Sequence, residues 1–203
     1  MPDTVVRARA IQVRYRRGGA LAVSGVNLDL RAGAGLLITG ASGSGKSSVL
    51  RAVLGLAGPG GEISVLGAPP GDPATLRRIG WAPQSWPFGY GLRAREVVEM
   101  VAALRGQDPG EAGRAIEEAG VGTPDARVEA LEVEDVRRTS LACALVGQPD
   151  LLVLDDPWEF PETTAAIRRA MDRGAAVLAA SKDPGGLPGL LGAGLHLVDG
   201  APG

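Results

Sequence analysis

The chain is poor in residues on which several classes of protein depend. Its 203 residues include one cysteine, Cys143, and one histidine, His196. A single cysteine cannot form a disulfide within the chain, and no pattern of a metal cluster, a catalytic triad or a redox site is present. The formal net charge is −2, so a broad basic surface for nucleic acid is not expected. Aromatic residues make up only 3%, which makes each possible stacking position worth attention.

Long apolar runs are also missing. The longest, such as Leu151–Leu154, are far shorter than the roughly 20 residues that a membrane-spanning helix requires. The first ten residues contain no apolar core of a secretory signal. Together with the lone cysteine, these features predict a cytoplasmic protein in a reducing compartment.

Short apolar segments alternate with helical patterns along the chain. Strands are predicted at residues 5–13, 22–30, 36–39, 62–66, 79–82, 151–155, 175–180 and 195–198. Helices are predicted at 46–56, 92–105, 109–119, 135–147 and 161–172. This alternation is typical of an α/β fold, in which the helical block before residue 147 is an insertion.

A glycine-rich segment between a predicted strand and a predicted helix has the strongest signal. It reads Gly40-Ala41-Ser42-Gly43-Ser44-Gly45-Lys46-Ser47 and matches the pattern G-x-x-x-x-G-K-[ST] in full. Glycines let backbone N–H groups turn towards a phosphate chain, and the following helix adds its positive end. Lys46 supplies a cation for phosphate, and Ser47 a hydroxyl for Mg²⁺. We therefore predict a nucleotide site formed by this loop and Ser48.

An acid lies at the end of a second apolar strand. Asp155 closes the segment LLVLD, whose other residues are apolar. A carboxylate at the carboxyl end of a buried strand can hold Mg²⁺ through its water shell. Asp155 is therefore the second predicted magnesium residue.

The order of these motifs resembles the ATP-binding domain of ABC transporters. Trp81-Ala82-Pro83-Gln84 is similar to the family's Q-loop, which implies that Gln84 contacts Mg²⁺. Tyr15 stands where the family places an aromatic that stacks on adenine. The segment Leu141–Pro157 resembles the helix and strand that lead to the magnesium-binding acid. The resemblance implies ATP as the nucleotide, and it extends from about residue 5 to residue 199.

The chain departs from the family in the motifs that serve hydrolysis. Anchored on the downstream LACAL, the family's LSGGQ signature corresponds to Leu131-Glu132-Val133-Glu134-Asp135. The hydroxyl and both glycines are replaced, and acids facing a triphosphate would repel it. Asp156 stands where the family has a glutamate as general base, and its side chain is one methylene shorter. Lys182 replaces the histidine of the family's switch motif.

The resemblance also implies a dimer, in which each nucleotide lies between the loop of one subunit and the signature of the other. Since this chain carries both kinds of departure, it impairs both sites whether it forms a homodimer or a heterodimer with another ATP-binding subunit. A separate transmembrane permease subunit is the expected membrane partner. The protein would then lie peripherally on the cytoplasmic face of the membrane.

These observations lead to one leading interpretation and two alternatives. The fold is predicted to be α/β, with a P-loop ATPase core, an N-terminal antiparallel β-subdomain and an inserted α-helical subdomain near residues 88–147. We expect residues 1–203 to form a single ABC-type ATP-binding domain that binds ATP with Mg²⁺ and hydrolyses it weakly, with Lys46 and Asp156 as catalytic candidates. A non-catalytic, regulatory ATP-binding subunit is the first alternative. A P-loop small-molecule kinase is the second, and Gln84 and the long helical insertion argue against it.

Overall fold

The structure is a computed structural model that describes residues 4–16, 18–85, 91–157, 160–183, 185 and 187–203. The strands are β1 (Thr4–Val13), β2 (Val23–Arg31), β3 (Gly35–Thr39), β4 (Pro59–Val65), β5 (Ile79–Ala82), β6 (Leu151–Asp155), β7 (Ala176–Ser181), β8 (Gly192–Val198) and β9 (Ala201–Pro202). The helices are α1 (Lys46–Val53), α2 (Pro73–Leu76), α3 (Ala94–Leu104), α4 (Gly110–Ala119), the 3₁₀ helix η1 (Val128–Ala130), α5 (Val133–Leu145), α6 (Pro161–Asp172) and α7 (Leu187–Leu191).

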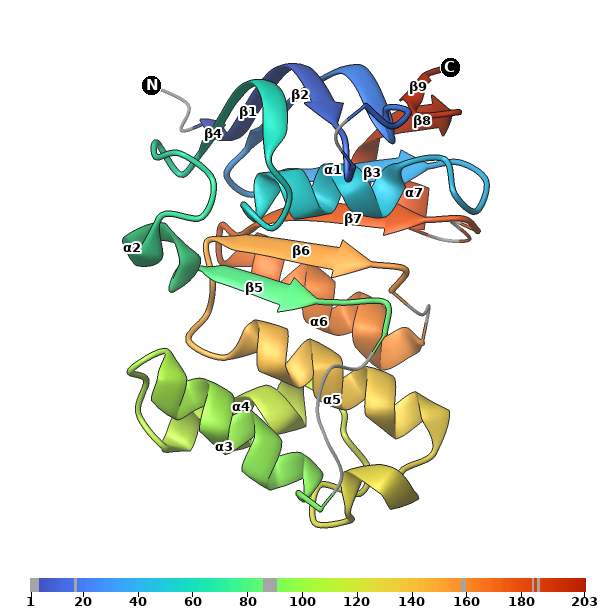
Figure 1. The fold of residues 1–203 in the computed structure, drawn as a ribbon. Helices are drawn as coiled ribbons and strands as arrows, with labels where there is room; N and C mark the ends of the chain where they lie inside the picture. The colour runs from blue at the N-terminus through green and yellow to red at the C-terminus, as the bar shows by residue number, and fades with distance from the viewer. Residues whose placement is uncertain (1–3, 17, 86–90, 158–159, 184, 186) are drawn as a thin grey trace.

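Two sheets form the framework. Strands β2, β1 and β4 make an antiparallel sheet, and a six-stranded sheet has the order β5-β6-β7-β3-β8-β9. All neighbours from β5 to β8 run parallel, and β9 adds an antiparallel edge. Helix α1 lies beneath the antiparallel sheet (Figure 1), and one hydrophobic core joins residues from both sheets and this helix.

The strand order determines where functional residues meet. Strand β7 lies between β6 and β3, and their register pairs Asp155 with Ala180 and Thr39 with Ser181. The carboxyl ends of these three strands therefore lie at one edge of the sheet. Ligands of open α/β sheets bind outside such an edge. The glycine-rich loop leaves β3 at this edge, next to the residues that follow β6 and β7.

Helices α3, α4 and α5 form a helical layer on the side of the molecule away from the antiparallel sheet (Figure 1). They are inserted between β5 and β6, which are neighbours in the sheet. A second hydrophobic core joins this layer to the sheet. The half-buried Arg105 also donates hydrogen bonds to the carbonyl oxygens of Ile79 and Val146, at 3.0 and 2.9 Å, and thereby ties α3 to β5.

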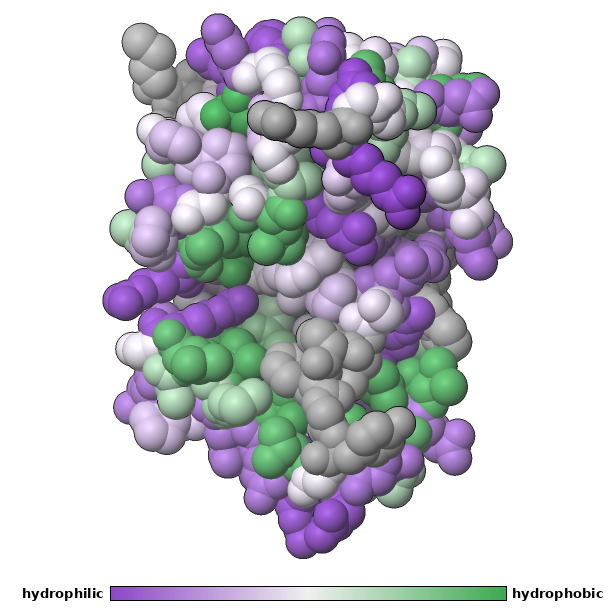
Figure 2. Space-filling view, viewed as in Figure 1, coloured by the Kyte–Doolittle hydropathy of each residue, from purple (hydrophilic) through white to green (hydrophobic). Residues whose placement is uncertain are grey.

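The structure confirms the predicted α/β class, the antiparallel β-subdomain and every predicted helix and strand within the described residues. Helices α2 and α7, the η1 turn and β9 were not predicted, because each is too short to show a periodic pattern. The first residues of the predicted helical block, 88–90, lie outside the described residues. No helix in the described part of the chain is long and apolar enough to cross a membrane. Figure 2 shows that apolar side chains on the viewed face are interrupted by hydrophilic ones.

Candidate nucleotide-binding site

The glycine-rich loop is packed too closely for larger residues at two positions. A Cβ atom on Gly40 would lie 2.3 Å from the carbonyl oxygen of Leu197, and one on Gly45 would lie 2.4 Å from that of Ala22. Both glycines also have positive φ angles, 145° and 96°, which side chains disfavour. The motif's glycines are therefore required by the loop's own conformation and by its contacts with distant segments.

The loop surrounds the ammonium group of Lys46. Its Nζ donates hydrogen bonds to the carbonyl oxygens of Gly40 and Ala41, at 2.8 and 2.7 Å. Within the described residues, the backbone N–H groups of Ser42, Gly43 and Gly45 have no hydrogen-bond acceptor. A buried cation beside open N–H groups and a helix N-terminus is an arrangement that suits phosphate. Burial lowers the pKa of Lys46, and the carboxylates of Asp156 and Asp155 oppose this shift.

The two predicted magnesium residues are in contact. The Ser47 hydroxyl donates a hydrogen bond to Asp155 Oδ1 at 3.0 Å, which joins the start of α1 to the end of β6. Asp155 is 7% exposed, and it has no ion pair with any described residue. Burial raises its pKa, although the Ser47 hydrogen bond and the charges of Arg51 and Lys46 oppose this effect. A hydroxyl and a buried carboxylate are hard oxygen ligands that fit Mg²⁺.

Asp156 follows β6 directly and has an unusual backbone conformation. Its φ angle is 57°, in the left-handed region that aspartate tolerates better than most residues. Gln84 Nε2 donates to Asp156 Oδ2, and Ser181 Oγ donates to Asp156 Oδ1, each at 3.3 Å. The Q-loop residue, the end of β7 and the candidate base are thus brought together. Gln84 contacts Asp156 in this structure, and it has no hydrogen bond to Asp155 or Ser47 within the described residues.

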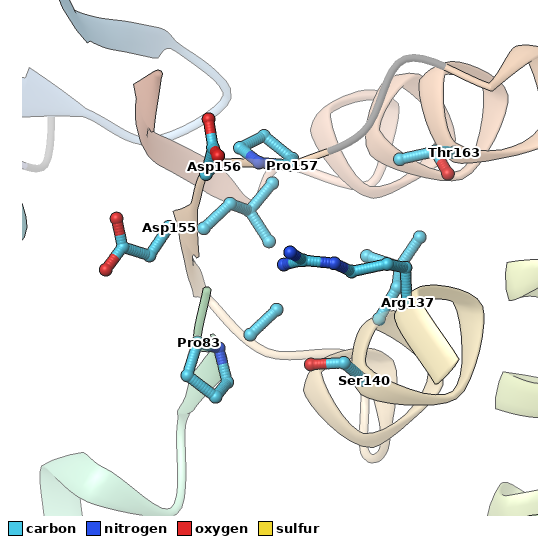
Figure 3. A pocket seen from close by; sticks show the side chains of 10 residues that line it. Pro83, Arg137, Ser140, Asp155, Asp156, Pro157 and Thr163 are labelled. Carbon is cyan, nitrogen blue, oxygen red and sulfur yellow. The ribbon is translucent and has the colours of Figure 1, made fainter. Parts of the chain in front are cut away.

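These side chains line one cavity. Its lining residues are Ser42, Gly43, Lys46, Ser47, Gln84, Asp155, Asp156, Ala180 and Lys182. Lys182 is exposed and has no ion pair with any described residue, so it adds a second cation to a cavity that also contains two carboxylates. A second pocket lies between α5 and the end of β6. In Figure 3, the Arg137 side chain points from α5 towards the end of β6, and the Asp155 carboxylate points away from Arg137.

Tyr15 lies in the loop that joins β1 to β2, and the residue is 55% exposed. Its hydroxyl donates a hydrogen bond to Ser48 Oγ at 3.0 Å. The predicted aromatic residue is thus attached to the first turn of α1, beside the glycine-rich loop. This contact was not predicted, because no pattern in the sequence relates these two residues.

The segment 131–135 does begin a helix, as expected, with α5 starting at Val133. Asp135, however, is buried, and its carboxylate accepts hydrogen bonds from the backbone N–H groups of Gly122 and Thr123, at 3.1 and 2.9 Å. Burial acts to raise its pKa, but these bonds, the Thr123 hydroxyl and the charge of Arg138 together hold it below its usual range. The acids left at this surface are Glu132 and Glu134, so the expected repulsion does not extend to Asp135.

Comparison with known proteins identifies the family. The sequence model of the ABC transporter family matches residues 23–159. The chain belongs to the ABC transporter family. Within it, the chain corresponds to the ATP-binding subunit. It is 33% identical over 173 residues to a putative ABC transporter ATP-binding protein of Halobacterium salinarum, a match that covers 76% of this chain and 72% of that protein.

Other ABC proteins agree with this assignment. The zinc import ATP-binding protein ZnuC of Pseudomonas fluorescens is 30% identical over 191 residues, which are 90% of this chain and 69% of that one. ZnuC of Chelativorans sp. is 34% identical, but the chain spans only 51% of its length. It likewise spans 50% of the Nod factor export ATP-binding protein I of Rhizobium sp..

Solved ABC structures share the fold. A dimeric form of the ATP-binding cassette MJ0796, bound to ADP and Pi, superposes with a TM-score of 0.84 at 22% identity, covering 97% of this chain and 96% of that one. A bacterial Atm1-family ABC exporter with ATP bound gives 0.80 at 20% identity, covering 98% of this chain and 38% of that one. At these identities the likeness concerns the fold alone.

Proposed function

We propose that this protein binds ATP with Mg²⁺ as the ATP-binding subunit of an ABC transporter and hydrolyses it slowly. The observation that carries the proposal is the contact of Ser47 with Asp155 beside the buried ammonium of Lys46. Lys46 and the open N–H groups of the loop, those of Ser42, Gly43 and Gly45, would hold the phosphates, and Tyr15 the base. Ser47, Asp155 and Gln84 would hold Mg²⁺, which supplies positive charge against the phosphates when it is bound.

The proposal extends to the organisation of the molecule. Residues 1–203 would form one ABC-type domain, with a helical subdomain at about residues 88–147. Partnership with a transmembrane permease and dimerisation are supported by the family and by the dimeric form of the MJ0796 cassette. A location on the cytoplasmic face of a membrane, through the permease, follows from the same partnership.

Slow hydrolysis follows from the departures in the site. Asp156, the candidate base, is short and already accepts hydrogen bonds from Gln84 and Ser181. The start of α5 offers Glu132, Val133 and Glu134 where donors to a developing negative charge would be needed. The same features also support the alternative of a regulatory subunit, which binds ATP without hydrolysing it.

A phosphate-release assay on the purified protein tests this proposal. We expect turnover close to background for the natural protein and for Asp156→Glu alone, because groups that act as a unit are not additive. Asp156→Glu combined with Lys182→His and the signature LSGGQ at positions 131–135 should raise the rate markedly. Rapid turnover by the natural protein would show that Asp156 is an adequate base.

A further inference from the structure

The pocket between α5 and the end of β6 is small and largely apolar. Its volume is about 30 Å³, which is enough for about two water molecules and far below the roughly 300–1,000 Å³ of pockets for small organic ligands. The apolar residues of its lining are Ala82, Pro83, Leu141, Leu154 and Pro157. Because only solvent-sized molecules fit this pocket, its polar lining groups decide whether it is wet or dry.

One polar side chain of the lining, that of Ser140, lacks a partner within the described residues. The residue is 5% exposed, and its Oγ atom is buried without a hydrogen bond. The preceding residue of α5 differs, because the buried Thr139 donates to the carbonyl oxygen of Asp135 at 2.6 Å. Serine hydroxyls in helices can form the same kind of bond, but Ser140 does not. Since a buried hydroxyl without a hydrogen bond destabilises the folded state, Ser140 requires a partner from outside the chain.

The polar groups of this lining suit a water molecule. In Figure 3, the Ser140 hydroxyl points from α5 towards Pro83, and the Arg137 guanidinium extends from the same side of α5. A hydroxyl group both donates and accepts hydrogen bonds, and a guanidinium group donates several. A buried water molecule needs about two to four such partners. These two side chains therefore supply the hydrogen bonds that hold a water molecule in place.

We propose that this pocket is an internal water site, in which Ser140 holds an ordered water molecule with Arg137 as its second partner. The inference does not rest on the proposed nucleotide site, because neither residue lines the nucleotide cavity. The pocket lies where α5 of the helical layer meets the segments that follow β5 and β6, at Pro83 and Pro157. The water molecule therefore fills the junction between the helical layer and the ends of these strands.

A crystal structure of the natural protein, at a resolution that shows ordered waters, tests the site directly. We expect a water molecule within hydrogen-bonding distance of Ser140 Oγ, which is about 2.5–3.0 Å. Absence of such a water molecule would overturn the inference. A Ser140 hydroxyl that donates instead to the carbonyl oxygen of Val136, one turn earlier in α5, would overturn it as well.

Thermal denaturation of Ser140→Cys provides a second test. Cysteine is close to serine in size and helix propensity, but its thiol forms only weak hydrogen bonds. In a hydrated site the substitution weakens the bond to water, so the melting temperature should fall by about 2–4 °C. In a dry pocket it removes an unsatisfied hydroxyl, so a higher or unchanged melting temperature would contradict the proposal. Ser24→Cys, at an exposed position of β2, is the matched control and should leave the melting temperature unchanged under reducing conditions.

Discussion

The residues of the candidate site differ in whether their polar groups have partners within the chain. Lys46 and Ser47 each have partners within the chain, in loop carbonyl groups and in Asp155. Asp155 differs from them, because its carboxylate is buried without an ion pair to any described residue and burial raises its pKa. This imbalance gives the site a measurable cost to stability, which is common where function needs a charge in a buried position.

Substitution of Asp155 by asparagine should raise the melting temperature of the ligand-free protein at neutral pH. Burial raises the pKa of Asp155, so its carboxyl group binds a proton more tightly in the folded state than in the unfolded state. The free energy of unfolding therefore falls as the pH rises above about 4, the ordinary pKa of an aspartate. Asparagine at position 155 carries no charge to bury, so the variant should have the higher melting temperature at neutral pH. This difference in melting temperature should disappear below pH about 4, where the aspartate is protonated in both states. Thermal denaturation across pH measures it. A lower melting temperature at neutral pH would show that the charge is stabilised.

Base selectivity is a second property of single residues. The predicted base contact of Tyr15 is a ring face, and an aromatic ring face stacks on any purine without distinguishing its edge groups. GTP should therefore compete with ATP within about tenfold, which corresponds to about 1.4 kcal/mol. Competition calorimetry with the two nucleotides decides the question. Exclusive binding of ATP would contradict this expectation, because it requires a base-specific hydrogen bond.

At the scale of elements, the start of α5 forms stabilising contacts that the sequence did not predict. The Asp135 carboxylate fixes the segment after α4 by accepting from Gly122 and Thr123. Arg138, one turn later, pairs with Glu162 on α6 at 3.1 Å and lies 5.5 Å from the ring centre of Phe160. The region that departs from the family signature thus joins the helical layer to the segment that follows β6.

Replacement of Asp135 by alanine should destabilise the protein by about 1–3 kcal/mol, because two backbone N–H groups lose their acceptor. Denaturant unfolding monitored by circular dichroism measures this loss. Glu132→Ala, a neighbouring exposed acid, is the control and should change stability by less than about 0.5 kcal/mol. If both variants were equally stable, the hydrogen bonds of Asp135 would contribute little.

The elements themselves could be predicted well from the sequence, because their signals are local. The apolar run before Asp155 favours a buried strand, and the glycines of residues 40–45 between a strand and a helix favour a phosphate-binding loop. The direction of the Asp135 side chain could not be predicted, since it depends on a loop twelve residues away. The same holds for the Tyr15–Ser48 bond and for the packing of Leu197 against Gly40, which bring together distant parts of the chain.

At the scale of the molecule, polar contacts bind the helical layer to the sheet and its flanking helix. Glu118 on α4 pairs with Arg173, directly after α6, at 2.7 Å, and Arg169 on α6 donates to the Glu118 carbonyl oxygen at 2.9 Å. With Arg138 and Arg105, these contacts span the boundary at several points. The helical layer is therefore held in a defined position relative to the sheet that carries the proposed site.

The central claim is that this chain holds magnesium ATP through Lys46, and isothermal titration of magnesium ATP tests it directly. The natural protein should bind, and Lys46→Ala should bind about ten- to a hundredfold more weakly, because a charge-assisted contact to phosphate is lost. Arg77→Ala, which removes an exposed cation outside the site, should leave affinity unchanged. Equal affinity of the natural protein and Lys46→Ala, or no binding by the natural protein, would contradict the account.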